Sequence, residues 1–189
     1  MMWDLPTEIQ IGEQIYHITK KCDYRMVLDV IIALNDEEMT TEEKVICGLL
    51  LFYEELTREN IRFCPHLEQL QKEMFRIING GEEQEENQEQ KPQLMDWQHD
   101  FPQLAPPISR VLGYDVRTPD KYTHWYSFLG GYMEIGECTF STIVSIRSKR
   151  AKGKKLDKWE EEYIREHRKM VELPRKLTAE EEEFLNSDW

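Results

Sequence analysis

The sequence predicts a mainly α protein, a small helical bundle with an N-terminal β-hairpin and two helical sub-domains. Three observations predict this fold class. Apolar residues recur at helical spacing through most of the chain. A strand-turn-strand pattern stands near the N-terminus, and a stretch rich in Glu and Gln separates two apolar-periodic halves. With 189 residues, the chain is long enough for one or two compact domains.

The hairpin is expected at the start of the chain. Two strands, Glu8–Ile11 and Gln14–Ile18, flank a dipeptide that begins with Gly12. Glycine at the first turn position suits a two-residue type II′ turn. In this register Ile9 faces Tyr16, which gives the hairpin an apolar face. Because an isolated hairpin is only marginally stable in water, this face is expected to lie on helices.

Three helices are expected after the hairpin. Asp23 is the expected N-cap of the first helix, and Thr40 with Glu43 makes a capping box for the second. The third helix begins near Pro65 and ends at Asn79-Gly80-Gly81. The apolar residues that these helices are expected to bury are Val27, Val30, Ile31, Leu34, Val45, Leu49, Phe52, Tyr53, Leu56, Leu67, Leu70, Met74, Ile77 and Ile78.

The second half begins with a short helix and an aromatic helix. The short helix is expected from Ile108 to Leu112 and ends at Gly113. The aromatic helix is entered after Thr118 or Pro119. Its stripe at positions i, i+3, i+4, i+7 and i+8 consists of Trp125, Phe128, Leu129, Tyr132 and Met133. The stripe predicts a buried core; the alternative is that Trp125 and Tyr126, on different faces, leave one aromatic to anchor a partner.

Two further helical segments follow. A helix that starts at Thr139 or Ser141 carries Phe140, Ile143, Val144 and Arg147. After a basic stretch, a helical seam with spacings of three, four and seven residues runs until Pro174. The residues of this seam are Leu156, Trp159, Tyr163 and Met170.

These signals divide the chain into four parts. Residues 1–79 form a hairpin plus helical domain, and residues 80–93 form an acidic Glu/Gln-rich linker without apolar periodicity. Residues 94–174 form a C-terminal helical domain that contains the aromatic helix. Residues 175–189 form an acidic helical tail with few apolar side chains.

Charge and composition exclude several classes of protein. The formal net charge of −13 argues against generalised binding to nucleic acid, although residues 147–158, RSKRAKGKKLDK, are strongly basic. A solvated face is the simpler interpretation of that stretch. The four cysteines are far apart and no apolar segment leads the chain, so a reduced, intracellular protein is expected. No apolar run approaches the roughly 20 residues that span a bilayer.

Catalytic motifs are missing from the sequence. Asp96 and Asp100 could share a helix face and bind a cation or do acid-base work, but such spacing arises easily by chance in an acidic chain. His124 could act as a general base, although a structural histidine is the commoner case. Cys64 and His66 lack the second close ligand pair of a zinc site. We therefore expect no enzyme activity, no cofactor and no metal.

The second half carries short motifs in a characteristic order. They resemble the tailed-phage gene-product-fifteen family, in which a YGIDL turn precedes an HWWKF helix and a T-F-x-x-I helix. Leu5-Pro6-Thr7 before the hairpin is also similar to the start of that family. The matching residues are Asp96-Trp97, Asp100, Gly113-Tyr114-Asp115-Val116, His124-Trp125-Tyr126-Ser127-Phe128-Leu129, Glu134, Thr139-Phe140, Ile143, Ile146-Arg147 and Leu173-Pro174. Two departures are Tyr126, where a second tryptophan is usual, and Gly113-Tyr114 in place of Tyr-Gly-Ile.

The resemblance implies a protein of siphophage or prophage tail morphogenesis. Such proteins are generally encoded just before the tape measure protein and are regarded as tail assembly chaperones, which coat that long apolar helical protein before tube subunits polymerise. The implied partners are the tape measure protein and other tail proteins, with this chain in a homo-oligomer or hetero-complex. The implied location is the host bacterial cytoplasm during virion assembly. No catalytic residues are carried over.

This role requires a surface that binds an amphipathic helix, and aromatic residues dominate such surfaces. Two alternatives stay open: a nucleic-acid-associated phage protein that uses the basic segment 147–158, and a structural subunit retained in the tail. Interleaved aromatics for stacking on single strands are missing from that segment. The candidate partner-binding residues are Trp125, Tyr126, Tyr132, Trp159, Arg147, Lys149 and Arg150.

Overall fold

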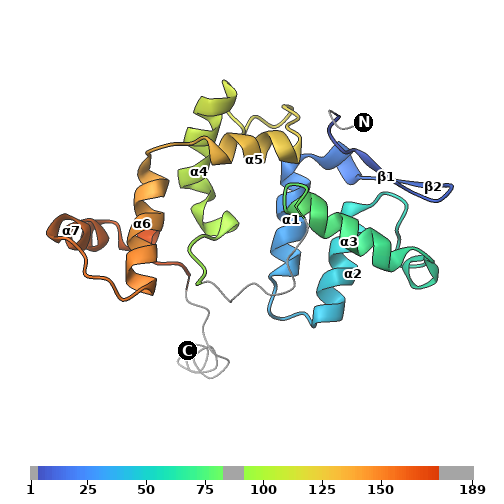
Figure 1. Cartoon of the computed structure of the whole chain (residues 1–189), viewed down its shortest axis with the longest axis horizontal. Helices are drawn as coiled ribbons and strands as arrows, with labels where there is room; N and C mark the ends of the chain where they lie inside the picture. Colours follow the sequence, from blue (N-terminus) through green and yellow to red (C-terminus); the bar gives the residue numbers. More distant parts are fainter. Residues whose placement is uncertain (1–3, 83–91, 175–189) are drawn as a thin grey trace, which may run out of the picture. The chain divides into compact units, whose positions relative to one another are not determined.

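The computed structural model describes residues 4–82 and 92–174 (Figure 1). This part of the chain is mainly helical, with a two-stranded antiparallel hairpin at its start, which confirms the predicted fold class. The greater part of the predicted linker at 80–93 and the whole predicted tail at 175–189 lie outside the described residues. In the described ranges, no helix is both long enough and apolar enough to cross a bilayer.

The elements follow one another along the chain, and Figure 1 labels both strands and helices α1 to α7. They are β1 (Glu8–Ile11), β2 (Gln14–His17), the 3-10 segment η1 (Thr19–Cys22), α1 (Tyr24–Leu34), α2 (Thr41–Phe52), the 3-10 segment η2 (Ile61–Phe63), α3 (Leu67–Ile78), α4 (Trp97–Leu112), α5 (Trp125–Met133), α6 (Thr139–Ala151), α7 (Lys158–Glu166) and α8 (Arg168–Val171).

The chain forms two compact units that are not consecutive in sequence. Unit 1 contains Met1–Lys91 and Leu104–Gly136, and unit 2 contains Pro92–Gln103 and Glu137–Trp189. This division differs from the linear one expected from the sequence, because the aromatic helix α5 packs with the helices of the first half. The reason is that apolar periodicity shows which residues of a helix are buried but not which helix covers them.

The hairpin has the predicted register. Ile9 pairs with Tyr16 across the two antiparallel strands. Gly12 has a φ of 62°, whereas Glu13 has no positive φ, as expected for a type II′ turn. Both Ile9 and Tyr16 are buried, so the apolar face of the hairpin is covered by the rest of unit 1.

Helices α1, α2 and α3 begin and end close to the predicted positions. Of the three, α3 packs against strand β1. The Asp23 side chain accepts a hydrogen bond from the Arg25 amide, and Thr40 with Glu43 forms both bonds of a capping box. These contacts confirm the predicted caps. The fully buried apolar residues of the three helices include Val27, Val30, Leu49, Phe52, Leu70, Met74 and Ile77.

Helix α4 corrects the prediction of a short helix from Ile108 to Leu112. It runs without a break from Trp97 to Leu112 and contains three prolines. An interior proline removes a backbone N–H and costs about 3 kcal/mol, which is why the sequence favoured only the last turns. The helix buries Leu104, Ala105 and Ile108 completely. Such packing, rather than local propensity, supplies most of the stability of a helix.

Helix α5 begins later than predicted. It was expected to start after Thr118 or Pro119, whereas it starts at Trp125, and the preceding residues are irregular chain. Its stripe is also only partly buried. Trp125 and Phe128 are buried, but Met133 is 72% exposed, because it is the last residue of the helix and the chain turns away there.

Unit 2 has a small core made by α6, α7 and α8. Ile143, Ile146 and Val171 are buried together, and the partly buried residues around them are Leu156, Tyr163, Ile164 and Met170. The predicted seam is wrong at Trp159, which is 55% exposed, while its neighbour Glu160 is buried. The seam is also divided at His167 into two helices.

Two adjacent glycines in α5 should respond oppositely to a larger side chain. A Cβ added at Gly131 would lie 3.2 Å from side-chain atoms of Ile108 and Leu112, whereas one at Gly130 would meet nothing within 4 Å. We expect Gly131→Leu to lower the free energy of unfolding by about 1–3 kcal/mol through overpacking. Gly130→Leu should leave it unchanged or raise it by up to about 1 kcal/mol through helix propensity. Urea denaturation followed by circular dichroism measures both; equal effects would contradict the packing of α5 on α4.

Candidate partner-binding surface

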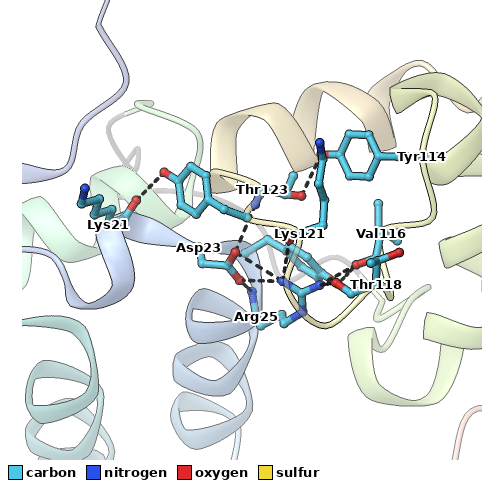
Figure 2. A network of polar contacts seen from close by, with 10 residues as sticks. Lys21, Asp23, Arg25, Tyr114, Val116, Thr118, Lys121 and Thr123 are labelled. Atoms are coloured by element: carbon cyan, nitrogen blue, oxygen red, sulfur yellow. Dashed lines mark hydrogen bonds and ion pairs between the residues drawn. The ribbon is translucent and has the colours of Figure 1, made fainter.

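Asp23, at the start of α1, links this helix to the chain that leads into α5. Besides capping α1, its carboxylate accepts a hydrogen bond of 3.1 Å from the amide of Thr123, and the Tyr24 amide donates to the Thr123 carbonyl at 2.9 Å. Asp23 and His124 also form an isolated antiparallel bridge. Figure 2 shows Asp23 and Arg25 facing the residues of this chain segment. The carboxylate therefore has a structural role.

Arg25 donates hydrogen bonds to three backbone carbonyls of the same irregular segment. Its guanidinium donates to the carbonyl oxygens of Val116, Thr118 and Lys121 at 2.7, 2.8 and 3.1 Å, and it also contacts Asp23 at 3.3 Å (Figure 2). These carbonyls belong to no helix or strand. Two of them have a second donor, since Val116 also accepts from the Tyr24 hydroxyl at 2.8 Å and Thr118 from the Lys121 amide at 3.2 Å. The guanidinium thus helps to fix the path of residues 116–121.

The turn before α1, which contacts the same segment, has an unusual backbone geometry. Lys20, Lys21 and Cys22 have φ values of 51°, 53° and 61°, a left-handed conformation that costs about 1–2 kcal/mol per residue. The Tyr122 hydroxyl donates to the Lys21 carbonyl at 2.7 Å, so the segment helps to hold the turn (Figure 2). Cys22 is fully buried, and burial raises the pKa of its thiol to about 12. A thiol in that state is a poor nucleophile.

His124 is the N-cap of α5. Its Nδ1 accepts a hydrogen bond of 3.0 Å from the Tyr126 amide, which places the proton of the neutral ring on Nε2. Nε2 then donates to the carbonyl of Pro6 at 3.0 Å. Both nitrogens are engaged and the residue is buried. Burial lowers the pKa of this imidazole from its ordinary value.

Three predicted partner-binding aromatics lie on α5. Trp125 is buried, stacks near Phe128 with ring centroids 5.8 Å apart, and donates from Nε1 to the Ile78 carbonyl at 3.0 Å. It belongs to the core of unit 1. Tyr126 and Tyr132 are half-buried. The Tyr126 hydroxyl is buried and has no hydrogen-bond partner within the described ranges.

Arg147, also predicted to bind a partner, is a buried structural residue of unit 2. It forms a two-pronged ion pair with Asp100 at 2.7 and 2.9 Å, and both side chains are almost fully buried. All five N–H groups of the guanidinium have an acceptor, the maximum that this group allows. The remaining three acceptors are the carbonyl oxygens of Leu94, Met170 and Val171.

Lys149 and Arg150 differ in their environment. Lys149 is paired with Glu160 at 2.7 Å and with Asp157 at 3.2 Å. These contacts raise the pKa of Lys149, and the hydrogen bond to Glu160 is the largest cause. Arg150 is half-exposed and lies 3.9 Å from Glu172. With Arg147 and Leu173 it lines a shallow hollow of about 380 Å³.

Trp159 is the one predicted aromatic that is largely exposed. It lies in the first turn of α7, directly after the exposed Lys158. The connection between α6 and α7 is basic and exposed as well. We define the Trp159 surface as Lys152, Lys154, Lys155, Lys158 and Trp159. Trp159 was expected in a buried helical seam. The basic segment that contains these lysines also contains Arg147, which is buried, and Lys149, which is paired.

The structural ion pair between Asp100 and Arg147 was missed by sequence reasoning, which treated Asp100 as half of a chance carboxylate pair. The available signal was that both residues belong to the family-like motif series. In residues 4–82 and 92–174, no group of three or more His, Cys, Asp or Glu side chains is arranged to hold a metal ion.

Comparison with known proteins returned one family. A model of the family described as "Bacteriophage Gp15 protein" matches residues 2–173. No curated protein gave a significant match, and no solved structure did.

Removing the guanidinium of Arg147 should strongly destabilise unit 2. We expect Arg147→Met to lower the free energy of unfolding by about 3–5 kcal/mol, because it leaves the buried Asp100 unpaired. Arg150→Met, on the same helix but half-exposed, should change it by less than about 0.5 kcal/mol. Urea denaturation measures the difference, and amide hydrogen exchange in α6 and α8 locates it. Equal effects of the two substitutions would contradict the assigned role of Arg147.

Protonation of His124 should destabilise unit 1. Because its pKa is lowered in the folded state, the unfolded chain binds the proton more readily. The contribution of His124 is therefore present above its unfolded pKa of about 6.5 and is lost as the pH falls below that value. His124→Asn retains a capping acceptor without this titration.

The test compares the free energies of unfolding of the two proteins between about pH 8 and about pH 5. The advantage of the wild type over His124→Asn should shrink as the pH falls. An advantage that stays constant or grows towards acid pH would contradict the neutral, capping imidazole.

Proposed function

Because the chain belongs to the bacteriophage Gp15 family, we propose that this phage protein is a tail assembly chaperone that binds the tape measure protein in the host cytoplasm. Tape measure proteins are long, apolar and helical, as the family resemblance implies. A chaperone for such a protein must present apolar side chains to a helix while remaining strongly charged elsewhere. The net charge of −13 meets the second requirement.

The observation that carries this proposal is the exposure of large apolar side chains on short elements. Phe63 in η2 is 83% exposed, Met133 is 72% exposed and Trp159 is 55% exposed. Scattered exposed apolar residues occur on most proteins. Trp159, however, is of the residue type most enriched at binding hot spots, and it lies on a helix whose neighbouring position, Glu160, is buried instead.

The polar groups of the molecule support a binding role without catalysis. Asp23, Asp100, His124 and Arg147 are buried, and each is engaged in hydrogen bonds that hold segments of chain together. A catalytic group needs access to a reacting atom, and these four have none in this conformation. We therefore propose that the protein is not an enzyme.

A second function, binding of nucleic acid, is favoured by the exposed lysines of the basic segment. Within that segment Arg147 is buried and Lys149 is paired with carboxylates, so these two residues are not available to a phosphate. Titration of single-stranded DNA at low and high salt distinguishes this function, since binding to phosphates weakens steeply with salt. A structural subunit, the third possibility, would be found by mass spectrometry of purified virions.

Co-expression with the cognate tape measure protein tests the proposed function. We expect the tape measure protein to move from the insoluble to the soluble fraction and to co-purify with this chain. The readout is the soluble fraction and the molar ratio in the purified complex, compared with co-expression of an unrelated acidic protein of similar size. Absence of any association, with both proteins expressed, would refute the chaperone role.

A further inference from the structure

The N-terminal turn of α7 has an unusual distribution of side chains. A charged residue, Glu160, is buried, and the large apolar side chain beside it, Trp159, is exposed. Glu160 is held inward because it pairs with Lys149 at 2.7 Å and accepts the Asp157 amide in the capping box at 2.8 Å. A helix anchored in this way cannot turn Trp159 into the core without breaking both contacts.

The lysines near α7 differ in whether they have a carboxylate partner among the described residues. Lys149 is matched by Asp157 and Glu160, whereas the four lysines of the Trp159 surface form no ion pair with residues 4–82 or 92–174. Four exposed lysines therefore lie within seven consecutive sequence positions, directly before the exposed Trp159. Like charges so close repel one another, and an anionic partner would relieve this repulsion.

We propose that the Trp159 surface binds an acidic stretch of the tape measure protein that carries an apolar side chain, which packs against the indole. This inference rests on the proposed function. Charge complementarity selects the occupant: the lysines need carboxylates, and Trp159 needs an apolar contact. A protein is favoured over nucleic acid because there is one indole rather than a series of stacking aromatics.

Complementary charges guide the encounter of two chains, and the central aromatic supplies most of the affinity. The interaction should therefore combine a salt-sensitive part from the lysines with a part that depends on the indole. In this arrangement Arg147 and Lys149 only support the surface. They hold α6, α7 and α8 together and do not themselves contact the partner.

The test uses the full chain and overlapping labelled peptides that cover the cognate tape measure protein, with binding measured by fluorescence anisotropy. Peptides that combine carboxylates with an apolar side chain should bind, and more weakly at high salt. Trp159→Ala should raise the Kd of these peptides by about 30-fold or more. The double variant Lys154→Glu and Lys155→Glu should raise it by about tenfold and reduce its salt dependence.

Two matched variants control for composition. Ile15→Ala removes another exposed apolar side chain, from unit 1, and Lys72→Glu reverses an exposed cation on α3. Both variants should bind the peptides with a Kd within about twofold of the wild-type value, which is a small difference in binding free energy. Circular dichroism confirms that each variant is folded, as expected for exposed positions.

The outcomes separate the two proposals. If the wild type does not associate with the full-length tape measure protein, the proposed function fails. If it associates but the Trp159 and lysine variants bind as the wild type does, only the assignment of this surface fails. Selection of basic peptides, displacement by single-stranded DNA, or a change from dimer to monomer in Trp159→Ala would each overturn the acidic protein partner in favour of another occupant.

Discussion

Each unit of this protein depends on the same interaction, an arginine that is fixed by an aspartate and donates to three backbone carbonyls. In unit 1 the pair is Arg25 with Asp23, and in unit 2 it is Arg147 with Asp100. Carbonyls in irregular chain and in the last turn of a helix lack a partner within a helix or strand, and a guanidinium has five N–H groups in a rigid fork. The carbonyls are those of Val116, Thr118 and Lys121 in unit 1, and of Leu94, Met170 and Val171 in unit 2.

The position of the aromatic helix follows from this interaction. Arg25 and Asp23 fix the irregular segment before α5, so that His124 reaches Pro6 and caps the helix while Trp125 reaches the last carbonyl of α3. The segment and the start of α5 are therefore held by side chains and backbone carbonyls of the first half. This explains why α5 belongs to unit 1, although residues 83–91 and helix α4 separate α5 in sequence from the other helices of that unit.

Helix caps and the hairpin turn could be predicted from the sequence, whereas packing between residues that are distant in sequence could not. The capping box at Thr40, the Asp23 cap and the hairpin turn at Gly12 depend on neighbouring residues, and all three are confirmed. Continuation of α4 through its prolines depends on burial of one helix face by distant residues. The exposure of Trp159 depends on an ion pair of its neighbour with Lys149. Helical spacing groups residues on a face but does not say which face is covered.

The residues that identify the family and the residues that could bind a partner are largely different. Asp100, His124, Trp125 and Arg147 belong to the family-like motifs, and all four are buried. Each is part of an internal network, so these motifs report the fold and not the partner. Trp159 lies outside them and is exposed. Exposed residues such as Trp159 can change with the partner while the two arginine networks stay unchanged. Partner specificity should therefore be sought at α7 rather than on the aromatic helix.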